Sequence, residues 1–269
     1  MLIDSHCHLD HHLYSKDLDK IIERAKKSGV KRIISAGIDF QTNLAVLKIR
    51  DKFPEIVKVS LGLYPEDALE KERNEEKESI PERKTLKENI KLIEDNKDKI
   101  IAIGEIGLDL YNGKNLKKQE EEFNAVLNLS KKIDKPIIIH SRKAEKEVLG
   151  ILEKLDFNPD KVILHCFSGN KSLVQQSIER GYNFSIPTNL VRSESFQYLI
   201  KICPLTKILT ETDGPYLSPY KNPDGSFNRN ESAFIKESIK KISEIKKISE
   251  KEIEKQIEEN YKRIFKDNI

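Results

Sequence analysis

The chain has 269 residues, of which 37% are hydrophobic and 35% charged, and its formal net charge is +3. This nearly balanced charge gives no strong basic field to steer a polyanion, so any recognition of phosphate must be local. No apolar run reaches the roughly 18 residues of a membrane span, the N-terminus has no leader pattern, and the three cysteines form no C-x-x-C pair, so we expect a cytoplasmic protein without a disulfide framework.

Short apolar runs rich in isoleucine and valine recur along the whole chain. Such runs, bounded by turn or charged residues, are typical of strands that are covered on both faces. Eight of them are predicted to be strands: Leu2–His6, Arg32–Ala36, Ile56–Leu61, Ile100–Gly104, Pro136–His140, Val162–Cys166, Tyr182–Ser185 and Lys207–Thr210. Helical patterns lie between them, and the last helix is predicted after Ser249, which matches a capping box with Glu252.

The repeat of strand, loop and helix predicts the fold class. Eight strands over the chain amount to about one unit per 34 residues, which suits a (β/α)8 TIM barrel formed by residues 1–269 as a single domain. An open, doubly wound sheet would alternate in the same way. We favour the closed form because the chemically notable residues are spread over the whole length, and a barrel brings all strand ends to one rim.

The segment from Glu66 to Lys84 breaks this repeat, because it is nearly all charge and contains Pro81. We expect a charged loop inserted after the third strand. It is either a mobile flap at the rim of the active site or a solvated surface excursion, and we favour the second interpretation. Loops of this length are uncommon unless they are functional or disordered.

Four of the six histidines stand at the ends of predicted strands. His6 and His8 are one residue apart, so on a strand they point the same way and form half of a metal site. His140 and His165 end two other strands, while Glu105 follows the fourth strand and Asp213 the eighth. The strand ends of a barrel share the face where catalytic groups lie.

Four imidazoles and two carboxylates exceed the needs of one catalytic zinc ion, which takes three protein ligands. They suit two divalent ions, and two metals about 3.5–4 Å apart can clamp an in-line displacement at phosphorus. The predicted metal ligands are His6, His8, Glu105, His140, His165 and Asp213. Zinc, manganese, magnesium and nickel all accept such mixed ligands.

Roles for these ligands follow from their order along the chain. Glu105 lies midway in the series and is the expected bridging carboxylate. His6 and His8 complete the set of the first ion, and His140 and His165 hold the second. Asp213 binds the first ion, accepts the proton of the attacking water, or does both, so Glu105 and Asp213 are the predicted catalytic residues.

Other polar residues near the strand ends have more than one interpretation. Asp109 and Glu211 are candidates to orient an imidazole by accepting its other N–H, although Glu211 is equally compatible with a paired core charge. Arg142 is predicted to bind phosphate, and the alternatives are a helix cap or an ion pair with Glu145. His11 and His12 are expected to be solvated.

Five motifs in order resemble those of the TatD family of metal-dependent deoxyribonucleases. They are Asp4-Ser5-His6-Cys7-His8-Leu9-Asp10, Gly104-Glu105-Ile106-Gly107-Leu108-Asp109, Ile139-His140-Ser141-Arg142, His165-Cys166-Phe167-Ser168-Gly169 and Glu211-Thr212-Asp213-Gly214-Pro215. The resemblance implies an amidohydrolase-type TIM barrel, the same six metal ligands, and hydrolysis of nucleic-acid phosphodiesters. The usual activity in this family is a 3′–5′ exonuclease that acts on DNA.

Two positions depart from the family pattern. Tyr64 stands where the family usually has histidine, and Ser232 stands where it usually has proline. A tyrosine can hydrogen-bond a phosphate oxygen but cannot be cationic. We therefore predict that Tyr64 contacts the substrate and that this change lowers the efficiency of DNA cleavage.

Two other functions remain open from the sequence. One is a barrel hydrolase that acts on an amide, a lactone or an aminoacyl ester. Many relatives of that kind bridge their metals with a carboxylated lysine on the fourth strand, and Glu105 at this position favours the phosphodiesterase. The other is a nucleic-acid-binding module with weak or no turnover, to which only Tyr64 points.

Overall fold

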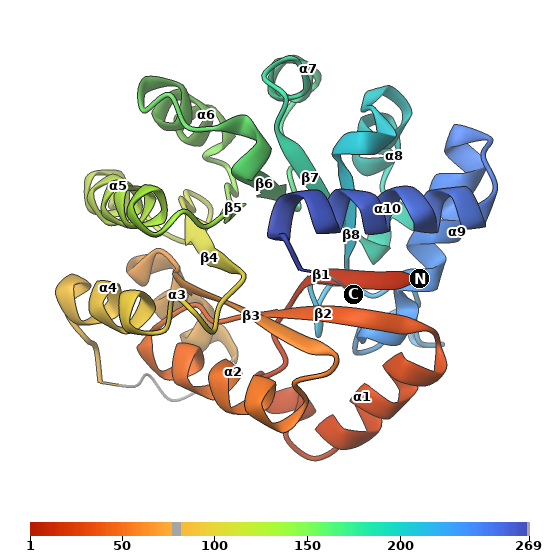
Figure 1. Ribbon diagram of the computed structural model, residues 1–269, viewed down its shortest axis with the longest axis horizontal. Coiled ribbons are helices and arrows are strands. Elements are labelled where there is room, and N and C mark those ends of the chain that lie inside the picture. The colour runs from red at the N-terminus through yellow and green to blue at the C-terminus, as the bar shows by residue number, and fades with distance from the viewer. Residues whose placement is uncertain (77–81, 268–269) are drawn as a thin grey trace. The chain divides into compact units, whose positions relative to one another are not determined.

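The computed structural model describes residues 1–76 and 82–267 (Figure 1). Its parallel strands form one sheet in the order β1 to β8. The strands are β1 Leu2–Cys7, β2 Val30–Ala36, β3 Val57–Leu63, β4 Ala102–Gly107, β5 Ile137–His140, β6 Val162–His165, β7 Asn183–Pro187 and β8 Ile208–Glu211. Every predicted strand is confirmed. One correction matters for function, because Glu105 lies inside β4 rather than after it.

Helices follow the strands along the chain. They are α1 Leu18–Lys27, α2 Phe40–Lys52, α3 Glu66–Glu76, α4 Leu86–Asp95, α5 Leu116–Ile133, α6 Glu145–Lys154, α7 Lys171–Glu179, α8 Glu194–Ile202, α9 Ile235–Lys246 and α10 Glu250–Phe265. The predicted capping box of Ser249 and Glu252 starts α10. Within the described ranges, no helix has both the length and the apolar character needed to cross a bilayer.

Contacts between residues divide the chain into two compact units that interleave along the sequence. The first unit comprises Met1–Ser35, Lys48–Lys58 and Asn183–Ile269, and the second comprises Ala36–Leu47 and Val59–Tyr182. In the first unit, β8 contacts β1, and α9 and α10 both contact these strands (Figure 1). In the second unit, β5 pairs with β4 and β6, and α5 contacts β4. The assignment of a single domain stays a prediction.

The strands are buried along nearly their whole length. Every residue of β1, β4, β6, β7 and β8 is buried. This includes polar side chains such as those of His6, Glu105 and Glu211. Because burial of a polar or charged group is costly unless the group is paired or binds a metal, these positions point to a site.

The prediction of a loop after the third strand is wrong for its first part. Residues Glu66–Glu76 form α3, in which Ala68 and Leu69 are buried and pack against Tyr64. The abundance of charge suggested a solvated loop, but the two buried apolar side chains are enough to pack this helix against the protein. Residues 77–81, including Pro81, lie outside the described residues.

Candidate metal centre

The second unit brings three of the predicted ligands together. The donor atoms of Glu105, His140 and His165 all lie within 4.8 Å of one another. Nδ1 of His140 is 2.9 Å and Nε2 of His165 is 3.8 Å from Oε1 of Glu105. Ligands that bind one ion tetrahedrally at about 2.1 Å are separated by about 3.4 Å, so this triad fits a divalent ion in both donor type and spacing.

Two glycines allow the strands of this triad to approach closely. A Cβ atom on Gly62 would lie 2.1 Å from the carbonyl oxygen of Glu105, and one on Gly107 would lie 1.9 Å from that of His140. Gly107 also has a φ of 144°, which L side chains rarely adopt. Gly62 therefore permits the close approach of β3 to Glu105, and Gly107 of the second motif permits that of β4 to His140.

Asp109 lies on the opposite side of the His140 ring from Glu105. Oδ2 of Asp109 is 3.0 Å from Nε2 of His140. If the Nε2–H of His140 is donated to Asp109, Nδ1 keeps its lone pair on the side of Glu105, where a metal ligand needs it. The hydrogen bond is the orienting contact that the sequence suggested for Asp109.

The charges around His140 favour a cation at this position. Burial alone would lower the pKa of His140, but its hydrogen bonds with Asp109 and Glu105 raise it to about 10. Burial would raise the pKa of Asp109, but the hydrogen bond with His140 holds it below its usual value. The buried carboxylates of Asp109 and Glu105 stabilise a positive charge beside them, and such an environment suits a divalent ion.

The hydroxyl of Tyr64 contacts both Asp109 and His140. It donates to Oδ2 of Asp109 over 2.9 Å and lies 3.1 Å from Nε2 of His140. The side chain is buried, with 5% of the residue exposed. The hydroxyl therefore supports the orientation of His140, and direct contact with the substrate stays a prediction.

Glu72 was missed by the sequence reasoning because it lies in the segment interpreted as a loop. From α3, its Oε1 accepts a hydrogen bond from Nδ2 of Asn112 over 2.6 Å and lies 3.3 Å from the Tyr64 hydroxyl. Burial raises the pKa of Glu72. Arg142 lies near it, with Nη1 3.7 Å from Oε1 of Glu72. No local sequence signal marks Glu72, since its partners come from distant segments.

The first unit brings the other three predicted ligands together. Oδ1 of Asp213 lies 3.7 Å from Nε2 of His6 and 3.6 Å from Nε2 of His8. The two imidazole rings meet edge to face with centroids 5.0 Å apart, so the side chains of His6 in β1 and of His8 just after it lie on the same side, as predicted. The side chain of His6 is fully buried, while those of His8 and Asp213 are 13% and 16% exposed. The carboxylate and the two imidazoles are donors of the types that divalent ions bind.

Backbone hydrogen bonds between the ends of β1 and β8 position the triad of His6, His8 and Asp213. The N–H of Asp213 donates to the carbonyl oxygen of His6 over 3.0 Å, and that of His8 donates to Gly214 over 2.8 Å. Asp213 has a φ of 53°, in the left-handed region, which turns the chain just after β8. The register between the two segments therefore places the carboxylate beside both imidazoles.

Asp4 is a second residue that the sequence reasoning missed. Its carboxylate accepts hydrogen bonds from the backbone N–H and the hydroxyl of Thr212, over 2.8 and 2.6 Å, and from the hydroxyl of Ser232 over 2.6 Å. The hydroxyl of Ser232 thus helps to satisfy a buried carboxylate. These bonds hold the segment that carries Asp213 against the start of β1.

Three other predictions have different outcomes. His11 is partly exposed, in line with the expectation of a solvated residue, and its Nε2 lies 3.0 Å from the hydroxyl of Tyr216 while its Nδ1 accepts from the N–H of Leu13. His12 is exposed, as expected. Glu211 is buried at the end of β8, and its orienting role stays a prediction.

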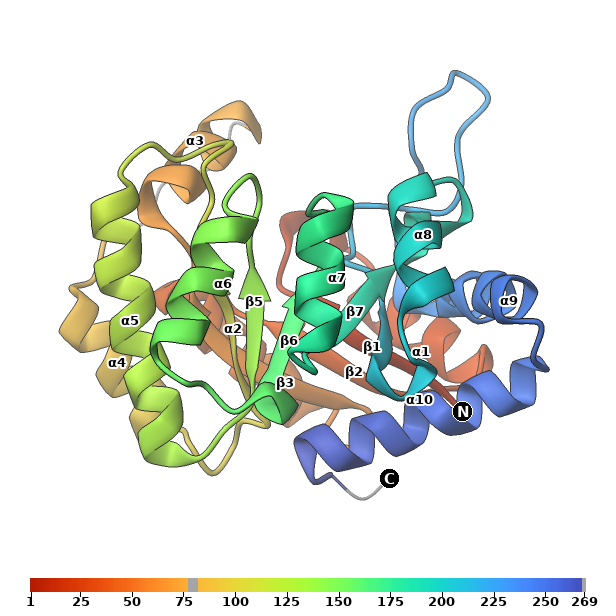
Figure 2. The same ribbon diagram turned by 90° about the horizontal axis from the view of Figure 1, so that it is seen from above.

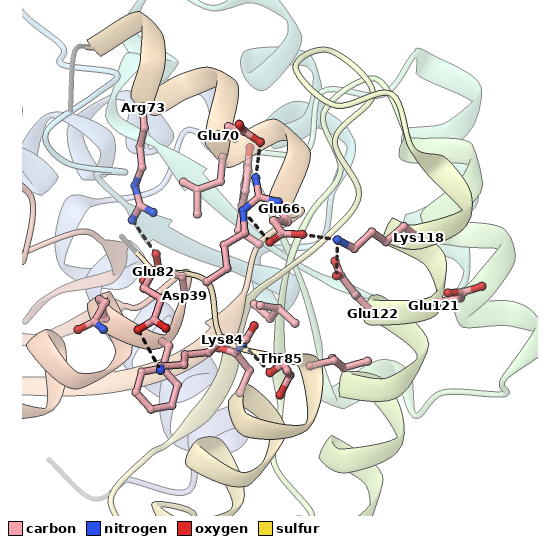
Figure 3. A pocket seen from close by; sticks show the side chains of 18 residues that line it. Asp39, Glu66, Glu70, Arg73, Glu82, Lys84, Thr85, Lys118, Glu121 and Glu122 are labelled. Atoms are coloured by element: carbon pink, nitrogen blue, oxygen red, sulfur yellow. Dashed lines mark hydrogen bonds and ion pairs between the residues drawn. The ribbon is translucent and has the colours of Figure 1, made fainter. Parts of the chain in front are cut away.

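A cavity of about 430 Å³ lies in the second unit beneath α3 (Figure 3). Tyr64 lines one part of it, and charged side chains line much of the remainder. Some of these charges pair with each other, as Arg73 does with Asp39 over 2.7 Å and Lys118 with Glu122 over 3.8 Å. The residues that line it include none of the six predicted ligands. This cavity is therefore not the place of the predicted chemistry.

Comparison with known proteins identifies the family. The family model described as TatD related DNase matches residues 3–266. The chain belongs to the TatD family. Its relatives include human "Deoxyribonuclease TATDN3", which is 32% identical over 98% of this chain and 94% of the relative, and the "Uncharacterized metal-dependent hydrolase YabD" of Bacillus subtilis, 31% identical over 100% of both. The "3'-5' ssDNA/RNA exonuclease TatD" of Salmonella typhimurium is 30% identical over 86% of this chain and 85% of the relative.

A solved structure settles the fold class. The TatD homologue YjjV from Escherichia coli matches with a TM-score of 0.82 and 24% identity over 99% of this chain and 98% of that chain. Together with the parallel strand order, this likeness shows the TIM barrel of TatD proteins and excludes the open, doubly wound sheet. As a TatD protein, the chain is a member of a family of metal-dependent hydrolases.

Proposed function

We propose that the protein hydrolyses nucleic-acid phosphodiester bonds with two divalent ions, as a deoxyribonuclease, and that it acts as a 3′–5′ exonuclease. The observation that carries this proposal is the pair of buried histidine and carboxylate triads, one in each unit. Family membership supports it, because relatives at about this level of identity are named deoxyribonuclease or exonuclease.

Each triad is proposed to hold one ion. His6, His8 and Asp213 would hold one ion and Glu105, His140 and His165 the other, while the bridging role of Glu105 stays a prediction from the sequence. When bound, such ions lower the pKa of a coordinated water and neutralise negative charge on a phosphate.

The remaining steps belong to side chains of the protein. The carboxylate of Asp213 is the proposed acceptor of the proton that the attacking water loses, since 16% of its side chain is exposed beside two buried or nearly buried imidazoles. Asp109 keeps the proton of His140 on Nε2, and Tyr64 holds Asp109 in place. The guanidinium of Arg142, which is 46% exposed, is proposed to bind a phosphate oxygen.

One experiment separates this function from its rivals. The metal-reconstituted protein is incubated with end-labelled single-stranded DNA, double-stranded DNA, RNA and an aminoacyl ester, and the products are resolved by size. We expect mononucleotides released from the 3′ end of DNA. Cleavage of the ester alone would identify a different hydrolase, and tight binding of DNA without any product would identify a binding module.

A further inference from the structure

Exposed large hydrophobic side chains are confined to one kind of loop. In the ranges that the structure describes, they are Leu13, Tyr111, Tyr216 and Phe227. Leu13 follows β1, Tyr111 follows β4, and the other two follow β8. Each of these loops leaves the carboxyl end of a strand that carries or directly precedes a predicted metal ligand. Single exposed apolar residues need no explanation, but this confinement to ligand-bearing strands does.

The two aromatic residues with the greatest exposure have cations over their rings. The guanidinium of Arg142 lies 3.9 Å from the ring centroid of Tyr111, and that of Arg192 lies 4.2 Å from the centroid of Phe227. Lys221 also lies over Phe227, at 5.1 Å. Arg142, Arg192 and Lys221 are themselves exposed. Aromatic faces beside solvent-accessible cations are what proteins use to stack bases and neutralise phosphates of a single strand.

Tyr216 lies one turn away from a predicted ligand. Its N–H donates to the carbonyl oxygen of Asp213 over 2.9 Å. Its ring meets that of His11 edge to face, with centroids 5.4 Å apart, and the N–H of His11 donates to the carbonyl oxygen of His8 over 3.1 Å. The aromatic pair is therefore tied on both sides to the His6, His8 and Asp213 triad.

Tyr111 has the equivalent place in the second unit. Its N–H donates to Oδ1 of Asp109 over 2.8 Å, and Asp109 binds His140 through its other oxygen. Phe227 lies farther along the loop after β8, which projects beside α8 in light blue in Figure 2. The backbone N–H of Tyr216 thus binds a residue of one triad, that of Tyr111 binds the carboxylate beside His140 of the other, and the loop after β8 adds Phe227.

We propose that Tyr216 and Phe227 of the first unit are base-stacking residues that bind an unpaired nucleic-acid strand, with Arg192 beside Phe227 to meet its phosphates. Tyr111 with Arg142 offers the same pair of groups in the second unit. This inference rests on the proposed function, since it names the residues that would hold that substrate. A duplex keeps its bases stacked inside the helix, so these side chains would select single strands or frayed ends.

The test compares strands that have and lack bases. The metal-loaded protein is titrated into a short fluorescein-labelled phosphorothioate strand of thymidine, and into an abasic strand of the same length, while fluorescence anisotropy is recorded. We expect Tyr216→Leu and Phe227→Leu each to weaken binding of the thymidine strand about fivefold or more and to leave binding of the abasic strand unchanged. Leu13→Ala, which removes an exposed side chain without a π face from a loop of the same kind, should behave as the unchanged protein.

Equal affinity of the unchanged protein for both strands would overturn the inference. Variants that weaken the binding of both strands to the same extent would also overturn it, because equal losses indicate a protein partner surface or a purely electrostatic contact. Hydrolysis of bis(p-nitrophenyl) phosphate, measured on the same samples, reports the proposed function separately. Discrimination between the two strands without hydrolysis would contradict the proposed function alone. Hydrolysis without discrimination would contradict the proposed stacking role alone. Thermal melting curves confirm that each variant is folded.

Discussion

Oδ2 of Asp109 lies 3.0 Å from Nε2 of His140, on the side of the ring opposite to Glu105. One imidazole therefore links a carboxylate that fixes its tautomer to a carboxylate of the proposed ion site. Residues that orient a metal ligand in this way commonly contribute as much to metal affinity as a weak ligand does.

Asp109→Asn is expected to weaken binding of one divalent ion by about 10- to 100-fold. The amide cannot hold the Nε2 proton as strongly as the carboxylate, so His140 presents its Nδ1 lone pair less often. Competition with a chelating dye measures the affinity. Asp95→Asn, at an exposed ion pair of α4, is the matched control. Unchanged affinity in Asp109→Asn would contradict the orienting role.

Tyr64→Phe is expected to weaken binding of the same ion by about fivefold, because one hydrogen bond to the Asp109 carboxylate is lost. The Michaelis constant for DNA should stay the same if the hydroxyl acts only through Asp109. A large rise of that constant with unchanged metal affinity would instead support the predicted contact between Tyr64 and the substrate.

Tyr64→His is expected to raise the rate of DNA cleavage, since histidine is the usual family residue and can carry a positive charge toward a phosphate. Steady-state rates on a labelled DNA strand measure the effect. A rate that is equal or lower would show that the tyrosine does not limit the activity of this protein.

Glu122→Gln is expected to stabilise the protein at high pH only. Burial raises the pKa of Glu122 from 4.5 to about 7, although Lys118 opposes the shift. The unfolded chain thus loses this proton at lower pH than the folded one, and stability falls as the pH rises between these two values. Because the side chain is partly solvated, the gain of the variant is about 1 kcal/mol at about pH 8 and absent near pH 4.

Urea unfolding at both pH values measures this difference, and Glu121→Gln on the exposed neighbouring residue is the control. Equal gains at the two pH values would show that the pKa of Glu122 is not raised in the folded protein.

Glu105→Ala is expected to abolish hydrolysis, with a loss of about 100-fold or more, and to leave the fold intact. The side chain is nearly fully buried and touches both imidazoles of its triad, so it has no close substitute. A fluorescent DNA substrate gives the rate, and Glu121→Ala is the control. Retained activity would contradict the proposed role of Glu105 as a metal ligand.

The strands and both triads were predictable because their signals are local. Apolar runs mark buried strands, and His6 and His8 follow the two-residue period of β1. Asp4 and Glu72 were not predictable, since what defines them are partners far along the chain: Asp4 binds Thr212 and Ser232, and Glu72 binds Asn112. The helix α3 was hidden because its few buried apolar residues are surrounded by charge.

The role of Tyr64 was also only partly predictable from the sequence. The sequence indicated that the residue is unusual for its family, and it suggested contact with the substrate. Only the geometry shows that the hydroxyl binds Asp109, because this contact joins the loop after β3 to the loop after β4.

Crystals grown with manganese and measured near its absorption edge give the most direct test of the two proposed ion sites. We expect two anomalous peaks per chain, one bound by His6, His8 and Asp213 and the other by Glu105, His140 and His165. A single peak, peaks bound by other residues, or no peak at either triad would contradict the proposal.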